Sequence, residues 1–164
     1  MIDIEWNHLR DVLNRYGDYF IKKAQENLLV GGNNVSGELT NSMEKIVLID
    51  KEKFSVRISV NDYWKYVNYG TKPHYPPIAA LKKWVEIKHI KPQTRNGKTP
   101  SVEQLPYMIQ KSIGKYGTKG THFWDDAYND TYEYFDEAIT LAIEEDIADA
   151  ITKIVEQFAT TLGG

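Results

Sequence analysis

The chain has 164 residues, of which 41% are hydrophobic and 26% charged, and it has no cysteine. This size and composition are typical of one globular domain with its own core, and the missing cysteine excludes disulfides, thiolate zinc sites and cysteine nucleophiles. The N-terminus is acidic and no apolar run approaches the length of a bilayer span, so we expect neither a secretory signal nor a membrane helix.

The net charge of −3 conceals an uneven distribution. Residues 65–120 carry eleven Lys or Arg against two acids, whereas residues 123–162 carry eleven Asp or Glu against Lys153 alone. Two solvated faces of opposite sign would account for this pattern. The alternatives are complementary contacts between neighbouring copies and a basic surface turned toward nucleic acid.

The first half of the chain predicts a helix and a hairpin. Apolar residues at steps of three and four indicate a helix over about 3–30, with Asp3 as its N-cap. Residues 45–60 indicate an antiparallel β-hairpin, because its second strand alternates between apolar and polar side chains. A bare hairpin is marginally stable, so we expect it to pack on helices or to extend into a larger sheet.

The stretch 63–77 combines five aromatic residues, one glycine and three prolines. The prolines exclude a central strand or the middle of a helix, so we expect an aromatic and proline-rich loop. Its aromatic side chains either anchor the loop on the core or form a docking surface for a partner. The candidate docking residues are Tyr63, Trp64, Tyr66, Tyr69, Gly70, Thr71 and Pro73.

The region that follows predicts a helix over about 77–89, a polar loop over 91–100 and a short helix over about 106–113. Its candidate basic patch consists of Lys82, Lys83, Lys88, Lys91, Arg95 and Lys98. We expect this basic patch to face either a neighbouring copy of the chain or DNA.

The last element is a helical pattern over about 123–162, which contains neither Gly nor Pro. A straight helix of this length would span about 60 Å, more than the width of a domain of this size. Its apolar stripe drifts around the axis, so we expect the helix to bend, to break or to pack on another subunit. The stripe consists of Phe135, Ile139, Ile143, Ile147, Ile151, Ile154 and Phe158. Altogether we expect one α+β domain over 1–164, with a small antiparallel sheet against two long helices and two short helices between them.

No catalytic or metal-binding pattern is complete. The four histidines lie on different predicted elements without metal-ligand spacing. The triplet 97–99, Gly-Lys-Thr, resembles the end of a phosphate-binding loop, but Pro92 stands at its first glycine position and Pro100 obstructs the following helix. Asp125 and Asp126 are the candidates for a metal-dependent enzyme, although acids in the first turn of a helix are ordinary partners of its dipole. We therefore expect no enzyme and no cofactor.

Three landmarks occur in order along the chain. Residues 36–43 read Ser-Gly-Glu-Leu-Thr-Asn-Ser-Met, and residues 66–73 read Tyr-Val-Asn-Tyr-Gly-Thr-Lys-Pro. Residues 109–127 contain a short helical pattern, then Gly-Thr-Lys-Gly-Thr, Phe-Trp and an alanine. As an ordered set over roughly residues 3–135, these landmarks resemble the head–tail connector and tail-completion proteins of tailed bacteriophages.

The family motif residues that match are Gly37, Leu39, Ser42, Phe123 and Ala127. The chain departs from the family pattern at Asn68, where Glu is usual, and at His122 and Asp126, where prolines are common. These departures bear on the subunit contacts more than on the fold.

The resemblance implies a non-catalytic structural protein of the virion neck, made in the cytoplasm of the host bacterium and located at the head–tail junction. Its partners would be further copies of itself in a ring, the adjacent neck, portal-adaptor or tail proteins, and DNA passing through the lumen, with no membrane. The alternative function is a small nucleic-acid-binding protein that stacks bases on Tyr63, Trp64, Tyr66 and Tyr69 beside Lys65. Against this alternative stand the isoelectric point of 5.8 and the acidic C-terminal region.

Overall fold

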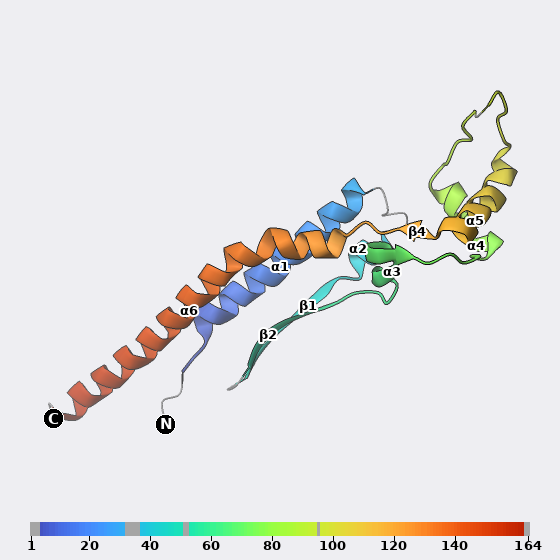
Figure 1. Cartoon of the computed structure of the whole chain (residues 1–164). Coiled ribbons are helices and arrows are strands. Elements are labelled where there is room, and N and C mark those ends of the chain that lie inside the picture. Colours follow the sequence, from blue (N-terminus) through green and yellow to red (C-terminus); the bar gives the residue numbers. More distant parts are fainter. Residues whose placement is uncertain (1–3, 32–36, 51–52, 95, 163–164) are drawn as a thin grey trace. The chain divides into compact units, whose positions relative to one another are not determined.

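The computed structural model describes residues 4–31, 37–50, 53–94 and 96–162 of an α+β chain (Figure 1). The sequence predicts one domain, and the structure divides the chain into two compact units. Unit 1 comprises Met1–Gln25, Met43–Ser59 and Asp125–Gly164, and unit 2 comprises Glu26–Ser42 and Val60–Trp124.

Two long helices, α1 and α6, begin and end the order of elements (Figure 1). The elements are α1 (Asn7–Val30), α2 (Glu38–Asn41), β1 (Glu44–Asp50), β2 (Lys53–Ser59), α3 (Trp64–Tyr69), β3 (Gly70–Thr71), α4 (Ile78–Ile87), the 3₁₀ helix η1 (Val102–Gln104), α5 (Leu105–Tyr116), β4 (Thr118–Lys119) and α6 (Phe123–Leu162). The α+β class, the hairpin, the two long helices and the short helices between them are as predicted.

The core of unit 1 joins the hairpin to both long helices. Strands β1 and β2 pair antiparallel from Glu44 opposite Ser59 to Asp50 opposite Lys53. The buried cluster consists of Leu9, Val12, Leu13, Phe135 and Ala142. Four hairpin residues pack against it, namely Val47, Ile49, Phe54 and Val56. One face of the hairpin is therefore covered, which gives this two-stranded sheet the packing that an isolated hairpin lacks.

Helix α6 is continuous, and its apolar stripe leaves the core of unit 1 part-way along. Each step of four residues advances a stripe by about 40° around a helix with 3.6 residues per turn. Phe135 is buried in the core cluster, and Ile143 is packed against that cluster. Two further steps bring Ile151 to an exposure of 53%, and Phe158 is 65% exposed. The stripe thus rotates away from the core along the helix, as predicted, and its later residues are exposed.

The N-terminus of α1 is capped by a side chain from the other end of the sequence. The Asp146 carboxylate accepts hydrogen bonds from the backbone N–H groups of Asn7, His8 and Leu9 at 3.1, 2.9 and 2.9 Å. Asp146 is 1% exposed. A carboxylate here satisfies donors that the first turn of a helix leaves unpaired and complements the helix dipole. The predicted cap, Asp3, lies outside the described residues.

A second contact joins the exposed parts of the same two helices. His8 bonds to Asp149 through Nε2 at 3.2 Å, and its Nδ1 lies 3.4 Å from Glu145. The hydrogen bond to Asp149, followed by the charges of the neighbouring carboxylates, raises the pKa of His8 above its usual value. The contact therefore stabilises unit 1 below the ordinary histidine pKa, and this stabilisation is lost as the pH rises through the raised value.

The structure corrects the expected loop over 63–77 at its beginning. Residues Trp64–Tyr69 form the helix α3. All three prolines of the stretch lie after this helix ends, so they do not obstruct it. The short helix expected over 106–113 also continues further, as α5, to Tyr116. It passes through Gly114, where the Tyr75 ring occupies the space that a side chain would need.

Replacement of Asp146 by alanine should lower the free energy of unfolding by about 2–3 kcal/mol, since it removes a cap and leaves buried N–H donors without an acceptor. Asp146→Asn keeps one acceptor oxygen and should lose less. Urea unfolding followed by circular dichroism measures the difference. Asp136→Ala, at an exposed position of the same helix, is the matched control; equal losses for Asp146→Ala and this control would contradict the capping role.

Candidate functional site

Two glycines allow the strands β3 and β4 of unit 2 to pair closely. Strands β3 and β4 pair Gly70 with Lys119 and Thr71 with Thr118. Gly70 has φ 77° and ψ −171°, and Gly117, just before β4, has φ 70° and ψ −159°. This region of backbone conformation is accessible essentially to glycine alone. A Cβ at Gly70 would also meet the Thr118 carbonyl, and one at Gly117 would meet the Thr71 carbonyl.

The residues after β4 are tied to the end of α3 by a second set of hydrogen bonds. The N–H groups of Thr121 and His122 donate to the carbonyls of Val67 and Asn68, each at 2.9 Å. The Asn68 side chain is fully buried, and its Oδ1 accepts the Trp124 N–H at 2.9 Å. Asn68, which stands where the resembled family usually has Glu, thus accepts a hydrogen bond from the first turn of α6.

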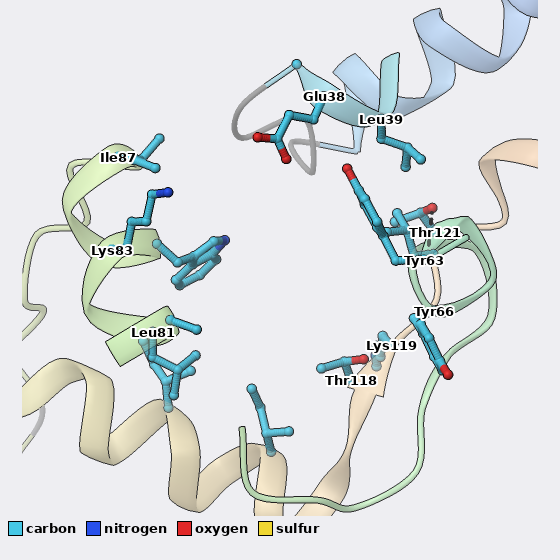
Figure 2. A pocket seen from close by; sticks show the side chains of 16 residues that line it. Glu38, Leu39, Tyr63, Tyr66, Leu81, Lys83, Ile87, Thr118, Lys119 and Thr121 are labelled. Carbon is cyan, nitrogen blue, oxygen red and sulfur yellow. Dashed lines mark hydrogen bonds between the residues drawn. The ribbon is translucent and has the colours of Figure 1, made fainter. Parts of the chain in front are cut away.

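An open groove of about 660 Å³ lies within unit 2 (Figure 2). Residues of α2, α3, α4, α5 and β4 line it. Its volume falls within the range, about 300–1,000 Å³, of sites that bind small molecules or groups of side chains. We take this groove as the candidate functional site.

The groove has apolar and aromatic walls on opposite sides. Figure 2 shows Ile87 on one side and Leu39, Tyr63 and Tyr66 on the other. Trp84, from the same helix as Ile87, also lines the groove and is 36% exposed. Exposed aromatic side chains in a concave apolar surface are typical of protein-binding sites.

The charged side chains that line the groove are two lysines and one glutamate. Lys83 of α4 and Lys119 of β4 line it, with Glu38 of α2 as the acidic member (Figure 2). Lys88 adds to this charge, since its ammonium lies 6.0 Å from the centre of the Trp84 ring. A ligand of this groove would therefore combine apolar groups with negative charge.

The structure separates the predicted docking residues into two sets. Tyr63 and Tyr66 line the groove. Trp64 instead packs against Trp124 at a ring-centre distance of 4.8 Å, with the rings inclined by 35°, which corresponds to the anchoring alternative. The remaining four do not line the groove, and they are Tyr69, Gly70, Thr71 and Pro73. Gly70 and Thr71 form β3, while Tyr69 and Pro73 are exposed.

The predicted basic patch also divides. Lys83 lines the groove, Lys88 lies against Trp84, and the Lys82 ammonium lies 5.9 Å from the centre of the Tyr107 ring. Lys91 and Lys98 are exposed and do not line the groove. Arg95 lies outside the described residues. Lys119, which the sequence did not single out, joins Lys83 because the β3–β4 ladder carries it there.

The residues that match the motifs of the resembled family lie in or next to α2 and at the start of α6. Gly37 precedes α2 in a left-handed conformation, Leu39 is buried, and the Ser42 hydroxyl donates to the Leu39 carbonyl at 2.8 Å. Phe123 and Ala127 are fully buried in the first turns of α6. Their burial accounts for these residue types by packing alone.

Among the described residues, no group of three or more His, Asp or Glu is arranged to hold a metal ion. None of the helices in the described ranges combines the length and the apolar character that crossing a membrane requires. Comparisons of the chain with protein-family models, with curated proteins and with solved structures give no match.

Replacing Gly70 by alanine should destabilise unit 2 by at least about 1–3 kcal/mol, because the backbone conformation is strained for any side chain. The clash with the Thr118 carbonyl adds to this cost. Urea unfolding followed by tryptophan fluorescence reports the loss. Gly97→Ala is the control, since Gly97 also has a positive φ but has open space around it. If both variants unfold at the same urea concentration, the close backbone approach at Gly70 does not matter for stability.

Proposed function

We propose that this chain is a structural subunit of a bacteriophage neck, a tail-completion or head–tail joining protein that forms a homo-oligomeric ring between the head or portal complex and the tail. The carrying observation is an uncovered apolar helix face. Ile147, Ile151, Val155, Phe158 and Leu162, here called the α6 stripe, are 39%, 53%, 61%, 65% and 86% exposed. A continuous apolar face of this kind is typical of a surface that another protein covers.

The α6 stripe lies on a different side of its helix from the residues that pack in unit 1. Ala142, Asp146 and Ala150 are buried and follow one another at steps of four. At 100° per residue, Phe158 lies about 120° around the helix from Asp146. The burial of α6 against α1 therefore leaves the stripe available for a further contact.

The arrangement of charge supports a contact between copies. Helix α6 contains eleven acidic residues and one basic residue, Lys153. The charged side chains that line the groove of unit 2 are two lysines and one glutamate. Identical copies that place dissimilar surfaces together make a heterologous contact, and such contacts close into rings when the rotation between copies allows it.

Three of the landmark residues occupy positions that backbone conformation or packing explains. Gly70 occupies a position that only glycine tolerates, and Phe123 and Ala127 are fully buried. Conformational and packing requirements therefore lie behind the residues that carry the resemblance. The partners that follow from the proposal are further copies of the chain, the adjacent neck, portal-adaptor or tail proteins, and DNA in the lumen.

One observation favours the alternative of a nucleic-acid-binding protein. In unit 2, lysine ammonium groups lie over the aromatic rings of Trp64, Trp84, Tyr107 and Tyr116. Lysines beside aromatic faces are the elements of a surface that stacks bases and neutralises phosphates. In this case a single strand of nucleic acid would lie across these rings, of which Trp84 lines the groove.

Light scattering after size exclusion, combined with electron microscopy of the peak fraction, tests the proposal. We expect a discrete multimer with a central channel, whose mass decreases at high salt because screening weakens contacts between the basic and acidic surfaces. A monomer at every concentration and salt, together with salt-dependent retention of single-stranded DNA on a filter, would contradict the ring and support the alternative.

A further inference from the structure

We infer that the α6 stripe of one copy docks into the groove of unit 2 of a second copy, as an amphipathic helix in an apolar groove. This inference rests on the proposed self-assembly and names the two surfaces that meet. Both surfaces are present in every chain, so identical subunits suffice to make the contact. Recognition of this kind uses apolar anchors at steps of three, four and seven residues.

The α6 stripe supplies such anchors. Ile151, Val155, Phe158 and Leu162 follow one another at steps of four, three and four. On the helix they lie within a sector of about 60° at 100° per residue. The groove offers Trp84 and Ile87 on α4 and Tyr66 on α3, which are apolar surfaces for an aromatic or branched side chain.

Charge favours the groove of the second copy, rather than its α6 stripe, as the surface that the stripe contacts. On the same side of α6, Glu144 lies three residues before Ile147, about 4.5 Å along the axis. This carboxylate has opposite charges to meet in Lys83 and Lys119 of the groove. Pairing of stripe with stripe offers no opposite charge, because Lys153 lies on another side of α6 and bonds to Glu5 at 3.0 Å. The docked arrangement therefore combines apolar burial with charge complementarity.

Crosslinking between single-cysteine variants tests the inference. The chain has no cysteine, so Phe158→Cys and Ile87→Cys each introduce one thiol. The two full-length variants are mixed, one of them labelled with ¹⁵N, and treated with a short bismaleimide. Mass spectrometry then distinguishes mixed pairs from pairs of like chains. We expect the mixed pair to exceed both like pairs at least several-fold.

Matched controls place the thiol on the same helices but outside the two surfaces. Thr160→Cys lies two residues from Phe158 and about 160° away around α6. Glu86→Cys precedes Ile87, is exposed and does not line the groove. We expect both control mixtures, Thr160→Cys with Ile87→Cys and Phe158→Cys with Glu86→Cys, to give far less of the mixed pair.

Three outcomes would overturn the inference. These are equal crosslinking in the control mixtures, predominant pairing of Phe158→Cys with itself, and no crosslinking in any mixture. The mass and shape of the unmodified protein separate this failure from that of the proposed function. A ring without the mixed crosslink refutes only the docking of stripe into groove, whereas a monomer that fails to crosslink refutes both.

Discussion

The mismatch between a four-residue apolar repeat and the 3.6-residue turn of an α-helix governs what α6 can do. A stripe that steps by four moves about 40° around the axis at each step, so a straight helix cannot keep it on one partner. Phe135 and Ile143 belong to the core of unit 1, and Ile151 and Phe158 do not. The helix is continuous from Phe123 to Leu162 and contains neither Gly nor Pro. A single element therefore contributes to the core of unit 1 and exposes an apolar face further along.

The long helices also depend on acceptors that come from distant parts of the sequence. Asp146 caps α1 across 137 to 139 sequence positions, and Asn68 accepts an N–H group in the first turn of α6. Asp146 and Asn68 are 1% and 0% exposed, so water does not reach their side chains. Each of these hydrogen bonds therefore replaces one that water would otherwise make. Buried, directional contacts of this kind fix where a helix begins more firmly than propensity does.

The parts of the fold that were predictable are those with a strong local signal. The bounds of α6 follow from a long pattern without helix breakers, and the hairpin follows from its alternation of apolar and polar residues. Helix α3 was missed because six residues are too few to show a helical period, and the nearby prolines suggested a loop. Asp146 gives no signal as a cap, since its partners are at the other end of the chain.

The groove could be predicted only in part for the same reason. Tyr63 and Tyr66 were identified from their density of aromatic neighbours, but Trp84, Ile87 and Lys119 come from elements whose packing no short motif encodes. The polarity of the charge distribution, in contrast, is visible in the sequence and recurs in the structure as a basic groove and an acidic helix. Local patterns thus predicted the elements and the sign of their charge, and tertiary contacts decide the rest.

The most direct test of the account is hydrogen–deuterium exchange of the full chain at increasing protein concentration. If the α6 stripe is a subunit interface, amides in residues 147–162 gain protection with concentration, because a helix end without a packing partner frays. Amides in residues 135–143, which pack inside the subunit, keep the same protection throughout. Protection of both segments that is independent of concentration would contradict the claim that a second copy covers the stripe.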